Sequence, residues 1–126
     1  MENFDAKADQ LLSRITTDER WDINDEILFN VLGFMYYGYC FGAGRLLWFM
    51  DPAAINAAVT QKLTSLGAGN KYVKGLVDEA YSTFQHPSNE LNAQLVEIGH
   101  SHFAAKDFAK LVDAVFDNAR AIKSVS

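Results

Sequence analysis

One fragment of the chain, Glu97-x-x-His100, has residue types and a spacing that could hold a metal ion. Residues three apart on a helix project to one side, and di-iron helical bundles use this pair twice, with two further carboxylates. Here the pair occurs once, His102 stands two positions further on and so on another helix face, and His86 precedes a proline. We therefore interpret Glu97 and His100 as a surface pair on a helix and expect no metal site and no cofactor.

Nucleophilic catalysis has one candidate by residue type, Cys40, which is the single cysteine of the chain. It stands in an apolar run, where burial raises the pKa of a thiol and suppresses its reactivity. The sequence contains no Gly-x-Ser-x-Gly turn and no glycine loop followed by Lys-Ser or Lys-Thr. The oxygen ligands that begin at Asp22 lack the glycine and glutamate of a calcium loop. We expect a protein that is not an enzyme.

The most unusual stretch, residues 27–50, is apolar on nearly all sides and carries four glycines among aromatic residues. A helix that is hydrophobic all round is a buried helix. Its rings supply more aromatic area than one helix normally needs, and aromatic residues are enriched at interface hot spots. The candidates for an interface or a pocket lining are Tyr36, Tyr37, Tyr39, Phe41, Arg45 and Trp48.

Gly38-x-x-x-Gly42 within this stretch is a small-residue pattern that permits a close approach between helices, in membranes and also in a soluble bundle. The eighteen residues from Ile27 to Gly44 carry no formal charge and have nearly the length of a membrane span. Asn30, the glycines and Arg45 dilute this hydrophobicity. We expect a central buried helix and no membrane insertion.

Helical periodicity fills nearly every other window, and two prolines and a few glycines interrupt it. Asp51-Pro52 is a strong helix start, and Gly67-Ala68-Gly69 suits a left-handed helix end. The chain is therefore predicted to be all-α, a compact bundle of about six helices in a single domain over residues 1–126. The predicted helices span residues 4–16, about 25–50, 52–66, 70–84, 91–98 and 108–122.

The last two predicted helices are expected to form an antiparallel hairpin, because the joint between them is short. This part of the chain, Leu95–Asn118, resembles one tetratricopeptide helical hairpin. Ile98-Gly99, the ring of His102 and the joint Lys106-Asp107-Phe108 fall where that repeat has Leu-Gly, Tyr and Gly-Asp-Tyr. Leu111 departs from the pattern, and no second copy lies about 34 residues earlier. The resemblance implies only a helical hairpin.

The net charge of -5 argues against nucleic acid as a partner, because such binding draws on clustered lysines and arginines. Residues 1–26 hold eight acids against three bases, which we interpret as a solvated helix face rather than a site for a basic partner. The N-terminus shows no signal or transit pattern, and the single cysteine fits a reducing compartment. We expect a cytoplasmic protein.

Two hypotheses for the function follow. The first is a non-enzymatic interaction module that binds a protein partner or itself, with a homodimer possible, such as an adaptor, inhibitor or immunity-type factor. The alternative is a small-molecule binder or enzyme with an apolar pocket beside the central helix. Its convergent polar groups would be tyrosine hydroxyls, Asn30 and Arg45.

Overall fold

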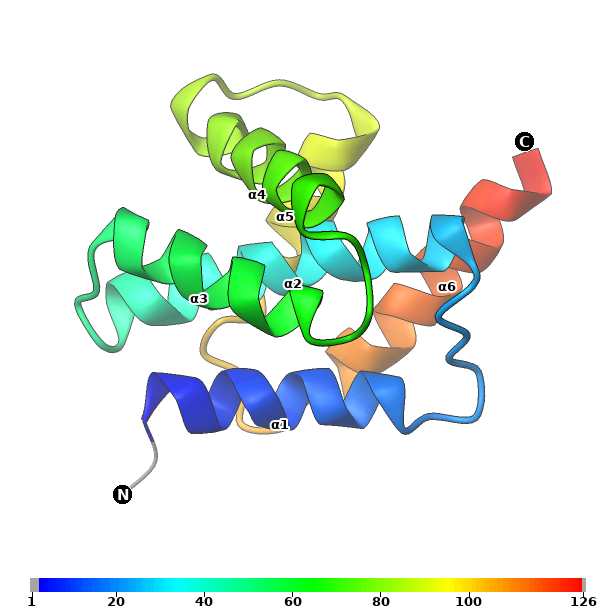
Figure 1. The fold of residues 1–126 in the computed structure, drawn as a ribbon, viewed down its shortest axis with the longest axis horizontal. Helices are drawn as coiled ribbons and strands as arrows, with labels where there is room; N and C mark the ends of the chain where they lie inside the picture. Colours follow the sequence, from blue (N-terminus) through cyan, green and yellow to red (C-terminus); the bar gives the residue numbers. More distant parts are fainter. Residues whose placement is uncertain (1–2, 126) are drawn as a thin grey trace.

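The computed structural model describes residues 3–125 and confirms an all-α bundle of six helices, with no strand among the described residues (Figure 1). The helices are α1 (Phe4–Thr16), α2 (Glu26–Leu46), α3 (Pro52–Thr64), α4 (Asn70–Gln85), α5 (Leu91–His100) and α6 (Ala109–Val125). Buried residues from every one of these helices join a single hydrophobic core.

Local signals set where the helices begin. The Asn3 side chain accepts a hydrogen bond from the Ala6 amide at 2.8 Å, and the Asp25 side chain accepts one from the Leu28 amide at 3.0 Å. These caps satisfy amides that have no partner within their own helix. Asp51 precedes Pro52 as predicted, although its side chain makes no capping hydrogen bond.

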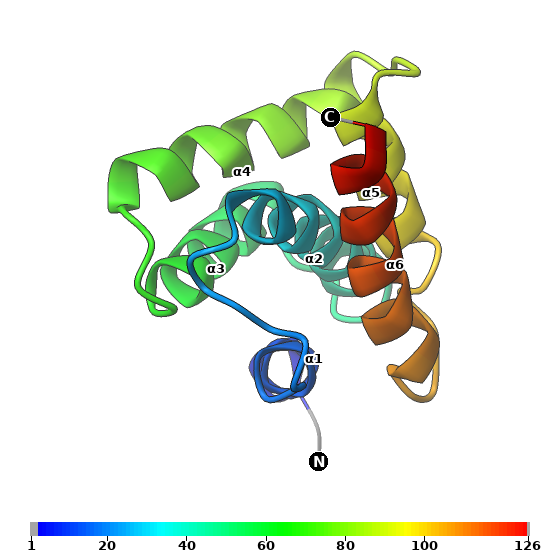
Figure 2. The same cartoon turned by 90° about the vertical axis from the view of Figure 1, so that its right-hand side faces the viewer.

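Helix α2 is the centre of the bundle. In Figure 2 it lies in the middle, with α3 and α4 on one side, α5 and α6 on another and α1 below. It is long and apolar enough to cross a membrane by length and composition, and 83% of its most apolar eighteen-residue window is buried inside the fold. It ends at Leu46, four residues before the predicted end at residue 50.

The closest helix packing in the fold joins α2 to α5. A side chain at Gly38 would clash with the Val96 carbonyl, and one at Gly99 would clash with the Met35 carbonyl. A Cβ atom at Gly42 would lie 2.7 Å from the Cβ atom of Phe103. Gly38 therefore packs closely on α5, as the pattern predicted, and Gly42 packs on the end of α5 and on Phe103 just after it.

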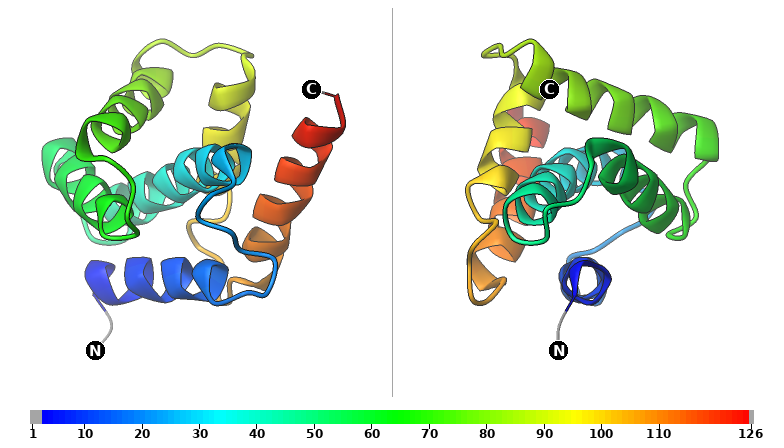
Figure 3. Two further views of the ribbon diagram at one scale, coloured as in Figure 1. Left: turned by 45° about the vertical axis from the view of Figure 1, so that its right-hand side comes forward. Right: turned by 90° about the vertical axis from the view of Figure 1, so that its left-hand side faces the viewer.

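The predicted C-terminal hairpin is wrong in its packing. Helices α5 and α6 run in roughly opposite directions (Figure 3), but each packs most closely on α2 and they make few contacts with each other. The apolar stripe of each helix faces the central helix because α2 offers apolar surface on every side. The structure therefore gives no support to the tetratricopeptide resemblance, which implied a hairpin.

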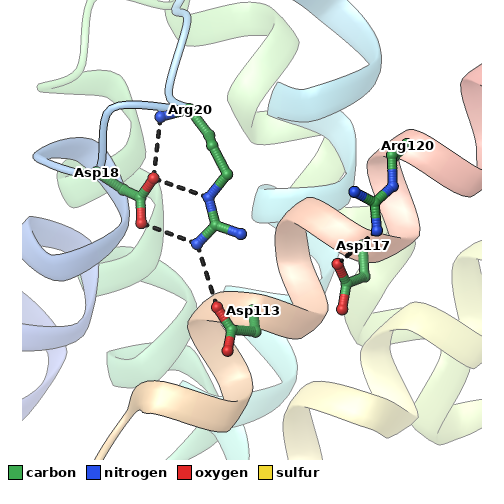
Figure 4. Close-up of polar contacts among 5 residues, drawn as sticks. All are labelled: Asp18, Arg20, Asp113, Asp117 and Arg120. Carbon is green, nitrogen blue, oxygen red and sulfur yellow. Dashed lines mark hydrogen bonds and ion pairs between the residues drawn. The ribbon is translucent and has the colours of Figure 1, made fainter.

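Ion pairs tie the acidic first quarter of the chain to the rest of the fold. Figure 4 shows Arg20 donating to both Asp18 oxygens at 2.9 Å and to Asp113 on α6 at 3.1 Å. Its guanidinium also lies 4.3 Å from the centre of the Phe116 ring. Hydrogen bonds from Arg20 lower the pKa of Asp18 to about 2. Arg20 thus connects the segment after α1 to α6.

Candidate functional site

The three tyrosines predicted as interface or pocket candidates lie in the core. Tyr36, Tyr37 and Tyr39 are all buried. The Tyr36 hydroxyl donates to the Ala8 carbonyl at 3.0 Å, and the Tyr37 hydroxyl donates to the side-chain oxygen of Asn56. Burial raises the pKa of both phenols, which therefore stay protonated. They join α2 to α1 and α3, and none of the three is presented to a partner.

Cys40 is fully buried, and burial raises the pKa of its thiol to about 12. The prediction of a raised thiol pKa is confirmed. A thiol with this pKa is almost entirely protonated near neutral pH, and the thiolate is the reactive form.

The polar groups of the alternative hypothesis do not converge. Arg45 is exposed and donates to the Met50 carbonyl at 3.1 Å. Asn30 is also exposed and accepts a hydrogen bond from Tyr72. The hydroxyls of Tyr36 and Tyr37 are engaged inside the fold, with the Ala8 carbonyl and the Asn56 side chain. Two of these polar groups thus lie at the surface, and two are engaged by partners within the fold.

Phe41 and Trp48 are the half-buried members of the predicted set. Phe41 stacks on Phe84 of α4 with ring centres 4.4 Å apart. Trp48 packs edge-to-face on Phe4 at 6.2 Å, which attaches the end of α2 to the start of α1. The structure therefore separates the predicted set into core tyrosines, a ring cluster at Phe41, and the end of α2 with the turn that follows it, at Arg45 and Trp48.

The largest apolar exposure near the end of α2 comes from three residues outside the predicted set of six. We call Leu46, Leu47 and Phe49 the apolar tip. Their exposed fractions are 52%, 46% and 85%. They lie where α2 turns into α3, at the left edge of Figure 1. Neighbouring exposed apolar side chains on a folded surface mark interaction sites, whereas scattered single ones do not.

The apolar tip contains a residue with an unusual backbone conformation. Phe49 has a φ of 54°, and it is the one non-glycine residue with positive φ in residues 3–125. A bulky residue is rare in this conformation, which costs about 1–2 kcal/mol because Cβ approaches the carbonyl oxygen. Helices that end this way usually place glycine there. The same chain does so after α3, where Gly67 has a φ of 109°.

Hydrogen bonds on either side of Phe49 hold the strained turn. The Met50 amide donates to the Gly44 carbonyl at 2.8 Å, and the Met50 carbonyl accepts from Arg45. The Leu47 amide still donates to the Ala43 carbonyl at 2.9 Å. Arg45 therefore braces the loop from outside, while Trp48 anchors it to the core.

Comparison of the chain with protein-family models, with curated proteins and with solved structures finds no match. The functional conclusion therefore rests on the geometry of the chain itself.

The acidic first quarter offers less free charge than its composition indicates. Lys62 of α3 pairs with Asp9 at 2.8 Å and with Asp5 at 3.3 Å, and Lys123 of α6 pairs with Asp25. Asp18 is held by Arg20. Much of this acidity is thus compensated inside the molecule, which leaves the apolar tip as the stronger candidate site.

Proposed function

We propose that this protein is a non-enzymatic interaction module that inserts the apolar tip into an apolar pocket of a protein partner. The observation that carries the proposal is Phe49, which is 85% exposed and stands in the left-handed region of backbone conformation. The backbone conformation opposes folding stability, since a glycine at this position would relieve it. The exposed ring adds almost nothing to the core, because little of its surface is buried on folding. Strain of this kind clusters at functional sites.

The surface beside the tip extends the area available to a partner. The first turns of α3 expose the small residues Ala53, Ala54 and Ala57. A stable interface buries roughly 1,200–2,000 Å² in total, which is more than three side chains supply. We therefore assign the tip the role of the anchor and the α3 surface the role of its surroundings, as is usual for interface hot spots.

A protein partner fits this surface better than a membrane. Weak membrane insertion by a few apolar groups is commonly reinforced by a basic patch that attracts anionic lipid. Within the turn 45–51, Arg45 is the one basic residue, and Asp51 offsets it. The whole chain carries a net charge of -5, which repels an anionic bilayer.

Photo-crosslinking tests the proposal. A benzophenone amino acid at position 49 is expected to give a discrete crosslinked band in cells that make the protein, because the probe would sit inside the partner's pocket. A second copy of the chain would appear as a crosslinked dimer. The matched control carries the same probe at Leu91, which is exposed to 50% at the start of α5.

Absence of a band specific to position 49 would contradict the proposal. Two results together would also contradict it: lipid adducts at position 49, and co-sedimentation of the purified protein with phosphatidylcholine–phosphatidylserine vesicles. That pair of results would identify a membrane as the surface bound.

A further inference from the structure

One hollow of the molecule lies between the end of α4 and α5, and its lining does not include the apolar tip. The volume of this pocket is about 230 Å³. This is smaller than the roughly 300–1,000 Å³ of pockets for drug-sized ligands, so it suits a compact molecule. Its walls include Phe84, Pro87, Ala93, Val96, Glu97 and His100.

Aromatic rings stiffen one wall of this pocket. The His100 ring lies 5.3 Å from the Phe84 ring and 5.8 Å from the Phe103 ring, measured between centres. Phe84 in turn stacks on Phe41 of α2. The pocket thus has a preformed aromatic wall, whose rings are positioned by three helices and by the segment after α5.

Glu97 and His100 bring the polar chemistry to the pocket, and both lie one turn apart on α5. Neither side chain makes a hydrogen bond or an ion pair with the residues that the structure describes. A carboxylate only accepts hydrogen bonds, and a neutral imidazole offers one donor and one acceptor. Glu97 is the one charged residue in the lining, so the pocket carries a negative charge that no lysine or arginine offsets there.

Burial lowers the pKa of His100, against the opposing influence of Glu97, and this keeps the ring uncharged at neutral pH. An uncharged ring does not repel a cation, and the faces of aromatic rings attract cations.

We propose that this pocket binds a small organic cation with an apolar body, of the class of a primary amine linked to a single ring. The ring would lie against Phe84 and His100, and the ammonium group would donate to the Glu97 carboxylate. The Glu97-x-x-His100 pair is then a ligand-binding pair rather than half of a metal site.

Titration with 2-phenylethylamine, followed by amide chemical shifts in NMR spectra, tests this inference. Saturable shifts are expected at the amides of Glu97, His100 and Phe84. The neutral analogue 2-phenylethanol should bind at least about fivefold more weakly, and the anion phenylacetate should give no saturable shift, because Glu97 repels it. These two probes share the ring and differ in the polar group.

The Glu97→Gln variant keeps the size of the side chain and removes its charge, and it should weaken amine binding at least about fivefold. Glu19→Gln is the matched control, since Glu19 is exposed on the segment after α1. Equal affinity for the amine and the alcohol, unchanged amine affinity in Glu97→Gln, or no saturable shift at these amides would overturn the inference. Loss of the crosslink at position 49 would not affect it.

Discussion

At the scale of single residues, Phe49 has a backbone conformation that lowers folding stability and a side chain that serves the proposed binding. Among residues 3–125, positive φ occurs at two positions, each just after a helix end: one carries Gly67 and the other carries Phe49. The glycine could be assigned from the sequence because its conformational freedom is known. The phenylalanine could not, because an aromatic residue in an apolar run predicts continued helix.

Replacing Phe49 with glycine should therefore stabilise the fold. We expect Phe49→Gly to raise the free energy of unfolding by about 1 kcal/mol, because glycine adopts positive φ without the Cβ penalty. The check is chemical denaturation followed by circular dichroism. Gly67→Ala is the control and should destabilise, since it places a Cβ atom at a φ of 109°. A lower unfolding free energy for Phe49→Gly would show that the ring supports the fold.

His100 is predicted to make stability depend on pH. Its folded pKa lies below its ordinary value of 6.5, so the unfolded chain binds the proton more readily. The stability that the neutral ring contributes is fully present above pH 6.5 and is lost as pH falls towards the folded pKa. Glu97 is the charged group that acts on this ring.

Denaturation midpoints measured from about pH 7 to pH 5 check this prediction. As the pH is lowered, the midpoint should fall less steeply in His100→Phe than in the wild type. His86→Gln is the matched control, because His86 is exposed. Equal slopes for His100→Phe and the wild type would contradict the assignment of a buried neutral imidazole.

At the scale of elements, the sequence predicted the six helices and most of their core residues, because apolar spacing and caps are local. The same information does not say which helix an apolar stripe meets, so the packing of α5 and α6 was missed. Nor could the sequence predict which way the tyrosines of α2 face, since a helix that is apolar all round has no single buried face. The apolar run 46–50 hid the helix end for the same reason.

The close packing of α2 on α5 should require glycine at position 38. Gly38→Ala is expected to destabilise the fold by about 1–3 kcal/mol, because the new methyl group meets the Val96 carbonyl. Gly75→Ala on α4 is the matched control: a Cβ atom there has nothing within 4 Å, so it should stabilise by about 0.5–1 kcal/mol. Thermal denaturation of both variants is the measurement, and equal shifts would contradict the close packing.

At the scale of the whole molecule, the aromatic core stabilises the fold and the candidate sites lie at the surface. The aromatic residues of α2 mostly build the core, and the site lies at the end of that helix, where the chain must turn and the core no longer covers it. Pairing by Lys62, Arg20 and Lys123 compensates much of the acidic first quarter. The two candidate sites are the apolar tip and the separate pocket at His100.

The most direct test of the central claim is the size of the protein in a fresh extract of its own cells, measured by gel filtration. The wild type should elute at an apparent mass well above that of a single chain, because its partner is bound. Phe49→Gly should elute as a single chain, and its higher stability would exclude unfolding as the cause. Identical elution of the two proteins would contradict a binding role for the apolar tip.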